Sequence, residues 1–221
     1  MSISTLLESK VLHQYVINQA QTNWSDIQKN MVYDAISQPH AQMNTALDQL
    51  QFISFLVKVI GARNAIEIGV FRGIGTLTIA SSLPQDGKVI ACDVTDEYVE
   101  GFKHYWQEAQ VIDKIDLRVA PATETLSELI ANGLQGTFDF IYVDADKSNN
   151  KRYYEMGLQL LKTGGVIAVD NVLDKGNVAL DWEQKQRAKL AREFNQYVAS
   201  DNRVDASLLS IGDGLYLIRK K

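Results

Sequence analysis

The sequence predicts an α/β fold in which a mainly parallel sheet of seven strands carries helices on both faces and ends in an antiparallel hairpin. From residue 65 onward, short β-rich segments alternate with helical ones, which is the pattern of a parallel sheet. Near the end, β-rich segments at residues 207–211 and 215–218 flank a Gly-Asp-Gly turn at residues 212–214, where glycines allow the positive φ of a hairpin. Residues 1–60 instead have the apolar spacing of helices.

The N-terminal segment carries two apolar stripes with helical spacing, and each is expected to bury against a core. The first stripe is Leu7, Val11 and Tyr15, and the second is Leu50, Ile53, Val57 and Ile60. Thr45 and Asp48 resemble a capping box with Asp in place of Glu. This pair predicts that a helix begins just before the second stripe.

The elements of the predicted sheet follow in order along the chain. The five parallel strands are expected at residues 65–70, 88–92, 115–119, 138–143 and 165–169. The connecting helices and the last long helix are expected at residues 76–82, 97–109, 123–132, 151–161 and 181–200. In the last of them, Leu190, Phe194 and Tyr197 lie on one side.

Length and composition predict a single domain. The 221 residues are 46% hydrophobic, enough for one substantial core, and no linker or repeat divides them. We expect residues 1–60 to form a helical cap on a core at residues 61–221 that binds a cofactor and a metal. The net charge of -5, with scattered basic residues, disfavours nucleic acid and anionic lipid as partners and favours a small molecule.

The cysteine count and the lengths of the apolar stretches predict a cytoplasmic protein. The single cysteine, Cys92, excludes an intrachain disulfide. The polar start lacks the basic and apolar regions of a signal peptide. Lys58 and Arg63 interrupt the longest apolar stretch, which therefore falls short of the roughly 18 residues that a membrane span needs. We expect a soluble protein in a reducing compartment.

A glycine-bearing segment follows the first predicted strand. In Glu67-Ile-Gly-Val-Phe-Arg-Gly-Ile-Gly75, the glycines allow the backbone to approach a ligand, and the following helix directs free N–H groups toward it. The spacing differs from the G-x-G-x-x-G of a dinucleotide site and is closer to the pattern of S-adenosylmethionine sites. The alternative interpretation is a tight turn between a strand and a helix.

Asp93 ends the second predicted strand. A carboxylate at that position accepts hydrogen bonds from ribose hydroxyls in nucleotide-binding folds. The alternative is a helix cap. The order of the glycine segment and the acid along the chain favours a role in cofactor binding.

Oxygen-bearing side chains follow the fourth and fifth predicted strands, which are neighbours in a sheet of this order. Asp144 follows one strand, and Asp170 and Asn171 follow the other, so two carboxylates and an amide oxygen can share one ion. Such ligands suit Mg²⁺, with Ca²⁺ or Mn²⁺ as alternatives. Lys147 lies close enough in the chain to reach a hydroxyl bound there. The alternative is a set of solvated loop acids, Asp146 among them, with Lys147 in a surface ion pair.

The composition disfavours zinc as the metal. The three histidines, His13, His40 and His104, lie outside these motifs. One cysteine cannot build a thiolate site. We expect each histidine to lie at the surface or to serve in packing.

Taken together, these motifs resemble those of the cation-dependent O-methyltransferases, the group of caffeoyl-CoA and catechol O-methyltransferases. The resemblance covers nearly the whole chain, with matching stretches at residues 7–15, 67–70, 138–147, 164–171 and 211–214. The Val-Asp-Ala-Asp-Lys and Asp-Asn blocks are its most specific parts. The family has a Rossmann-like class I methyltransferase fold, which a nucleotide-type sheet closed by a terminal hairpin also indicates.

The resemblance implies roles for individual residues. It places Asp144, Asp170 and Asn171 at the metal, and it makes Lys147, beside Asp144, the residue that assists deprotonation of the acceptor. It implies that the S-adenosylmethionine site is lined by Thr45, Glu67, Gly69, Val70, Asp93, Ala122 and Asp146, with Gly75 where the family often carries a serine. The implied reaction methylates a hydroxyl of a phenolic, catechol-like or other vicinal-hydroxyl small molecule. The resemblance also favours a homodimer.

Three other functions stay open at this point. Enzymes similar to this group methylate a hydroxylated tRNA base, although the acidic balance argues against RNA. A nicotinamide-dependent oxidoreductase would need the dinucleotide glycine spacing. A non-catalytic binding module would keep the glycine segment without needing Asp144, Lys147 and Asp170 together. The loop Leu173-Asp-Lys-Gly176 departs from the aromatic and small polar residues frequent in the family, which leaves the identity of the acceptor open.

Overall fold

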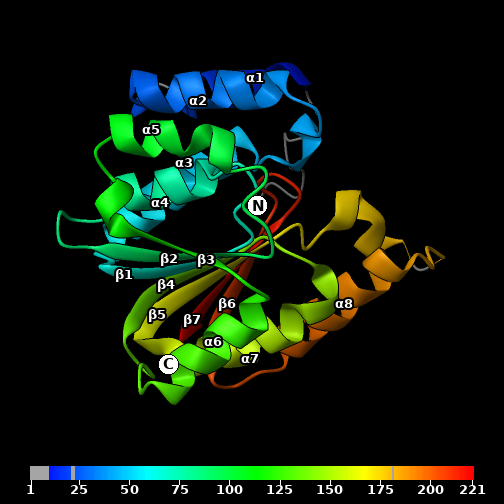
Figure 1. The fold of residues 1–221 in the computed structure, drawn as a ribbon. Helices are drawn as coiled ribbons and strands as arrows, with labels where there is room; N and C mark the ends of the chain where they lie inside the picture. The colour runs from blue at the N-terminus through cyan, green and yellow to red at the C-terminus, as the bar shows by residue number, and fades with distance from the viewer. Residues whose placement is uncertain (1–9, 21–22, 181) are drawn as a thin grey trace.

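The computed structural model describes residues 10–20, 23–180 and 182–221, and a seven-stranded sheet lies at the centre of this part (Figure 1). Its strand order is β3-β2-β1-β4-β5-β7-β6. The first five strands pair in parallel, and β7 pairs antiparallel with β5 and β6, as predicted. The strands are β1 (Asn64–Ile68), β2 (Lys88–Asp93), β3 (Ile115–Val119), β4 (Phe138–Val143), β5 (Leu161–Asp170), β6 (Val204–Leu209) and β7 (Leu215–Lys220).

Helices cover both faces of the sheet (Figure 1). On one side lie α1 (Lys10–Ala20), α2 (Asp26–Ser37), α3 (Leu47–Val59), α4 (Ile74–Ser82) and α5 (Lys103–Glu108). On the other lie α6 (Ala122–Ala131), α7 (Asn150–Leu160) and α8 (Gln186–Ala199). Short 3-10 turns complete the described part: η3 (Ala41–Met43), η4 (Glu100–Phe102), η5 (Ile112–Lys114), η6 (Lys147–Asn149) and η7 (Asp174–Ala179).

Strand β4 shows how the two core layers form. It is buried along its whole length, because helices cover both faces of a parallel sheet. Successive side chains point to opposite faces, so Phe140 and Tyr142 join the core beneath α3 and α4, whereas Ile141 and Val143 join the core against α6 and α7. Its apolar run, which only Asp139 interrupts, therefore marks a central strand.

Helix α3 confirms the second apolar stripe and corrects the predicted cap. Leu50, Ile53 and Val57 are fully buried. The helix begins at Leu47 after Ala46, and no side chain caps its first turn. The predicted capping box is wrong because the Thr45 hydroxyl instead donates a long hydrogen bond, 3.5 Å, to Asp144. A residue that contacts a distant acid thus occupies a place that resembled a helix cap.

The first apolar stripe is not a buried face, contrary to the prediction. Val11 is 82% exposed and Tyr15 is 61% exposed, and Leu7 lies outside the described residues. Helix α1 is in the outermost layer of the helical cap, and no described element covers this side of it (Figure 1). Helical spacing alone does not say whether a neighbour covers the stripe.

Several predicted boundaries also differ from the structure. The helix expected at residues 97–109 is divided into η4 and α5, and the last helix begins at Gln186 rather than at Asp181, which lies outside the described residues. Strand β5 starts earlier than expected, at Leu161, because Leu161 pairs with Phe138 before a bulge restores the register at Phe140. The ends of β4 and β5 at Val143 and Val169 still lie side by side.

Candidate active site

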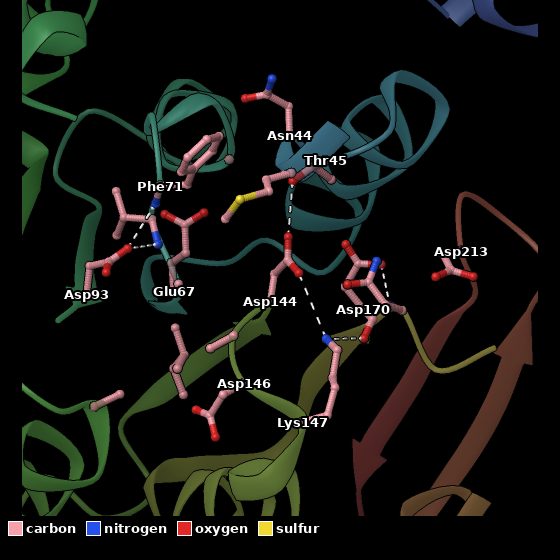
Figure 2. Close-up of a pocket in the computed structure, with 18 of the residues that line it drawn as sticks. Asn44, Thr45, Glu67, Phe71, Asp93, Asp144, Asp146, Lys147, Asp170 and Asp213 are labelled. Carbon is pink, nitrogen blue, oxygen red and sulfur yellow. Dashed lines mark hydrogen bonds and ion pairs between the residues drawn. The ribbon is translucent and has the colours of Figure 1, made fainter. Parts of the chain in front are cut away.

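A cavity of about 1490 Å³ opens at the carboxyl ends of the parallel strands. This is the edge where open α/β sheets bind ligands. Its size exceeds the roughly 300–1,000 Å³ of a typical small-molecule pocket, so it has room for two small molecules side by side. The loop between β1 and α4 forms one side, and the segments after β4 and β5 form the other (Figure 2).

Glycines bring the β1–α4 loop against the sheet. Gly69 has a φ of 92°, and a Cβ there would lie 2.2 Å from the backbone oxygen of Asp144. Gly73, with a φ of 77°, precedes the first residue of α4. A Cβ on Gly75 would lie 2.2 Å from Glu67 Oε1. The segment is therefore more than a tight turn, since Gly69 and Gly75 are needed for close approach to groups that line the cavity.

Backbone N–H groups of the same loop hold Asp93. Its Oδ2 accepts hydrogen bonds from the N–H groups of Val70, at 2.8 Å, and Phe71, at 2.9 Å (Figure 2). Its Oδ1 accepts from the N–H groups of Val94, at 2.7 Å, and Thr95, at 3.4 Å. A carboxylate has about four acceptor sites, and the long contact from Thr95 is the one that a ligand in the cavity would most readily replace. The acid fixes the loop rather than capping a helix.

Glu67 is a buried acid beneath this loop. It is 1% exposed, and the Thr76 hydroxyl donates a hydrogen bond to its carboxyl group. Burial raises the pKa of Glu67 to about 8, although the hydrogen bond from Thr76 opposes the shift and the negative charges of Asp144 and Asp93 reinforce it. The side chain is therefore mainly neutral at pH 7 and adds little negative charge to the cavity.

Asp144 and Asp170 come together at the ends of β4 and β5, as predicted. Val143 and Val169 pair in the sheet, so the acids that follow them occupy equivalent positions. Asp170 is 2% exposed. Burial and the nearby charge of Asp170 raise the pKa of Asp144 to about 7, although the charge of Lys147 opposes this shift. Two carboxylates thus repel each other in a site that only partly admits water.

Lys147 lies between the two acids (Figure 2). Its Nζ is 4.0 Å from Asp144 Oδ1 and donates a 2.9 Å hydrogen bond to the backbone oxygen of Asp170. Burial lowers the pKa of Lys147, and the charges of Asp144 and Asp170 oppose that shift. The prediction that Lys147 reaches this site is therefore consistent with the geometry, and its ion pair is not a surface one.

The donor set fits a hard divalent cation. Asn171 has a φ of 54°, a conformation that asparagine tolerates, and its Nδ2 donates to Asp170 Oδ1 at 2.9 Å. The amide oxygen of Asn171 is thus free to join two carboxylate groups that one lysine does not neutralise. Within the described ranges, no group of three or more His, Cys, Asp or Glu side chains is arranged to hold a metal. Any cation here would need the amide and added ligands such as water.

Comparison with known proteins gives the family. A sequence model of the O-methyltransferase family matches residues 18–221. The chain belongs to this O-methyltransferase family. It is 38% identical to the caffeoyl-CoA O-methyltransferase of Eucalyptus gunnii, over 98% of this chain and 90% of that protein. It is 40% identical to the probable caffeoyl-CoA O-methyltransferase 2 of Dictyostelium discoideum, over 89% of this chain and 86% of that protein.

A solved structure agrees with this membership. The O-methyltransferase from Bacillus cereus in complex with SAH has a TM-score of 0.85 and 26% identity, covering 98% of this chain and 100% of that one. The chain is therefore an S-adenosylmethionine-dependent O-methyltransferase. Membership favours methyl transfer over the nicotinamide-dependent alternative. Among the described residues of this methyltransferase, no helix is long and apolar enough to cross a membrane.

The other residues predicted to bind the cofactor of the methyltransferase also line the cavity: Thr45, Val70, Ala122 and Asp146. The Asp146 carboxylate is already engaged, since the N–H and Nδ2 of Asn149 and the hydroxyl of Tyr153 donate to it. Partial burial raises its pKa, but hydrogen bonds from Ser148, Tyr153 and Asn149 outweigh that effect and lower it. Asp146 therefore shapes the start of η6 as well as the wall of the cavity.

The structure adds residues to the methyltransferase site that sequence reasoning missed. Asp213, in the β6–β7 turn, lines the cavity, and its Oδ1 accepts a hydrogen bond from the N–H of Lys175. Gln49 of α3 and Arg187 of α8 also line it. Tyr142 lies beneath it and donates to Asp170. The Gly-Asp-Gly motif in the sequence pointed to the position of Asp213, whereas no sequence motif pointed to Gln49 or Arg187.

Proposed function

We propose that this O-methyltransferase requires a divalent cation and methylates a hydroxyl of a catechol-like or other vicinal-hydroxyl small molecule. The observation that carries the proposal is the pairing of Asp144 with Asp170 in the same cavity as the Gly69 loop and Asp93. The relatives named for caffeoyl-CoA support a phenolic acceptor. Mg²⁺ is the proposed cation, with Ca²⁺ or Mn²⁺ as alternatives.

In this proposal, Asp144, Asp170 and Asn171 hold the cation. When bound, a divalent cation supplies positive charge that orients adjacent hydroxyls and lowers the pKa of the attacking one. Lowering a phenol pKa from about 10 to about 7 corresponds to roughly 4 kcal/mol. Asp144 and Asp170 keep the acceptor hydroxyls at one end of the cavity, opposite the glycine loop.

The donor occupies the other side. The glycine loop lets the backbone contact S-adenosylmethionine closely, and Asp93 accepts a hydrogen bond from a ribose hydroxyl in place of its long contact from the N–H of Thr95. The proposed lining of the donor site is Thr45, Glu67, Gly69, Val70, Gly75, Asp93, Ala122 and Asp146. A neutral Glu67 suits a positively charged sulfonium less than a carboxylate would, so its role is to support the loop.

Lys147 takes the proton from the acceptor hydroxyl. Its ammonium must first be deprotonated, which burial favours and the charges of Asp144 and Asp170 disfavour. Its Nζ already lies beside both acids, so a hydroxyl held there is within reach. Alignment of the hydroxyl with the donor methyl group supplies a further part of the rate, because oriented reactants at about 3 to 3.5 Å avoid much of the entropic barrier.

Metal removal tests the proposed function. The protein is treated with EDTA, desalted, and assayed with S-adenosylmethionine and either a catechol or the matching monophenol. We expect turnover of the catechol to require added Mg²⁺ and the monophenol to react far more slowly. Equal turnover of the catechol with and without metal would refute the cation requirement. Equal turnover of the two acceptors would refute the vicinal-hydroxyl preference.

We also propose that the chain forms a homodimer. Large apolar side chains are exposed on three described N-terminal helices: Val11, Tyr15, Tyr33, Ile36, Phe55 and Val59. Burial of apolar area of this kind stabilises subunit contacts. Light scattering with size-exclusion chromatography should give twice the 24.7 kDa mass of one chain. A monomer at micromolar concentration would contradict the proposal.

A further inference from the structure

A buried tyrosine lies directly behind the acid pair. Tyr142 is 1% exposed and sits in β4 two residues before Asp144, so it points to the same face of the sheet. Its hydroxyl donates a 2.9 Å hydrogen bond to Asp170 Oδ2. The Nε2 of Gln49, a fully buried residue of α3, donates to that hydroxyl at 2.9 Å. Three side chains from α3, β4 and β5 thus form one chain of hydrogen bonds.

The direction of these hydrogen bonds follows from how many protons each of the three side chains can donate. A carboxylate that binds a cation is deprotonated and can only accept, so Tyr142 must give Asp170 its single hydroxyl proton. The phenol oxygen must then accept, which requires Gln49 to present its NH₂ group. As a result, Gln49 Oε1 has no hydrogen-bond partner among the described residues. Leaving a buried amide oxygen unpaired costs about 1–3 kcal/mol of stability. The hydrogen bond from Gln49 to Tyr142 is therefore kept in spite of that cost.

The backbone leaves room for this arrangement. Gly212 has a φ of 57°, and a Cβ there would lie 2.4 Å from Gln49 Oε1. The β6–β7 turn therefore closes over the Gln49 amide only because residue 212 is glycine. On the other side, Asn171 Nδ2 holds Asp170 Oδ1 at 2.9 Å. Hydrogen bonds from other side chains therefore hold both carboxylate oxygens of Asp170.

We propose that Tyr142, supported by Gln49, is a positioning residue that orients the Asp170 carboxylate for the cation. Tyr142 is not part of the cavity lining, so it does not touch donor or acceptor and acts through Asp170. With Oδ2 held by Tyr142 and Oδ1 by Asn171, the carboxylate cannot rotate away from Asp144. This inference rests on the proposed cation requirement. It adds residues that hold a metal ligand rather than bind the metal.

The test measures cation binding directly. Mn²⁺ is titrated into metal-free protein, and free Mn²⁺ is followed by its electron paramagnetic resonance signal, without turnover. Tyr142→Phe removes only the hydroxyl and keeps the ring. We expect it to weaken Mn²⁺ binding roughly 10-fold or more, since partners that orient metal ligands are typically worth 10–100-fold in affinity.

Tyr154→Phe is the matched control. Tyr154 is fully buried in α7, on the other side of the sheet, and its hydroxyl donates to Asp201 Oδ2 at 2.8 Å. This variant also loses one buried tyrosine–aspartate hydrogen bond, but far from the acid pair. We expect it to lower thermal stability comparably and to bind Mn²⁺ like the wild type.

Gln49→Met gives a second route to the same answer and serves if Tyr142→Phe fails to fold. Gln49 contacts Tyr142 and also lines the cavity, so its substitution should weaken Mn²⁺ binding by several-fold, and the part of this effect that acts through Tyr142 should be absent in the Tyr142→Phe background. Wild-type protein that binds no Mn²⁺ would defeat the proposed cation requirement itself. Wild-type binding retained unchanged in Tyr142→Phe, or in Gln49→Met where that variant stands in, would overturn the positioning role alone.

Discussion

The two sides of the cavity hold their carboxylates in different ways. On the side formed by the β1–α4 loop, called the donor side after the proposed function, four backbone N–H groups donate to Asp93, so the protein itself satisfies most of that charge. On the side formed by the segments after β4 and β5, called the cation side, Asp144 and Asp170 lie side by side, and among the described residues Lys147 is the close cation. Glu67, between them, avoids further repulsion because burial keeps it mainly protonated at pH 7. Asp93 is satisfied without a ligand, whereas the repulsion between Asp144 and Asp170 would be relieved by the cation that we propose.

The backbones of the two sides differ as well. Besides glycines, the donor loop has one residue with a side chain at positive φ, Phe71 at 50°, whereas the segment after β5 has three: Asn171, Asp174 and Lys175, at 54°, 45° and 57°. Such conformations cost roughly 1–2 kcal/mol for residues with a side chain. The Asp213 carboxylate, which accepts from the N–H of Lys175, helps to hold this loop. The acceptor side is thus shaped by contacts between distant segments, such as the one between Lys175 and Asp213.

Substituting one acid on each side of the cavity should give the largest difference between the two sides in activity and ligand affinity. Asp170→Asn should lower kcat/KM about 1,000-fold, because the bound cation supplies several kcal/mol to the reaction. Its affinity for S-adenosylhomocysteine, measured by calorimetry, should stay within a few-fold of the wild type. Asp93→Asn should do the reverse: it should weaken S-adenosylhomocysteine about 10- to 100-fold and leave Mn²⁺ affinity intact. If each variant impaired both ligands equally, the two sides would not be separate sites.

Gly69 connects the two sides, and its substitution has the next largest effect. In Gly69→Ala, the new Cβ would lie 2.2 Å from the Asp144 backbone oxygen, which cannot move without displacing β4. We expect a loss of about 3 kcal/mol or more in unfolding free energy, measured in urea, with weaker binding of both ligands. Gly176→Ala is the control: its φ is 84°, but nothing lies within 4 Å of its Cβ. It should cost only about 1–2 kcal/mol. Equal losses of unfolding free energy in the two variants would mean that the positive φ, and not the contact with Asp144, causes the effect of Gly69→Ala.

Glu67 gives a pH-dependent effect that belongs to the donor side. Its pKa rises from the ordinary 4.5 to about 8 on folding. Between those values the folded state binds a proton that the unfolded chain has released, so unfolding free energy falls as pH rises, by up to about 1.4 kcal/mol per pH unit. Glu67→Gln, which still accepts from Thr76, should flatten this decline in urea titrations of metal-free protein at pH 5.5, 6.5 and 7.5. Parallel curves for variant and wild type would contradict a neutral Glu67.

The smallest effect is expected at the rim of the acceptor side. Arg187 Nε lies 2.9 Å from Asp174 Oδ1, but its side chain is 55% exposed, and exposed pairs contribute little. Arg187→Ala should raise the acceptor KM a few-fold, with kcat and S-adenosylhomocysteine affinity unchanged. A change in donor affinity would show that this loop reaches across the cavity.

The donor side was largely predictable from sequence, since its parts are local. A mostly apolar run marks β4, the glycine segment follows β1 directly, and Asp93 ends β2. The pairing of Asp144 with Asp170 was predictable too, because sheet order makes β4 and β5 neighbours. In these cases one short stretch contains both the strand and the functional residue at its end.

The remaining features depend on long-range packing. Gln49 and Tyr142 are 93 positions apart and meet only when α3 lies on the sheet. Thr45 resembled a cap because its neighbours fit that motif, whereas a distant acid determines where its hydroxyl points. Val11 and Tyr15 have helical spacing but no described cover. A local sequence pattern does not show which distant residue a side chain will contact in the folded protein.

A crystal structure with Mn²⁺, S-adenosylhomocysteine and a catechol tests the central claim most directly. The account predicts one anomalous peak at roughly 2 Å from oxygens of Asp144, Asp170 and Asn171, with the catechol hydroxyls completing the shell. The donor should lie against Gly69 and Asp93. A complex in which S-adenosylhomocysteine and catechol are both bound while no anomalous density lies between Asp144 and Asp170 would contradict it.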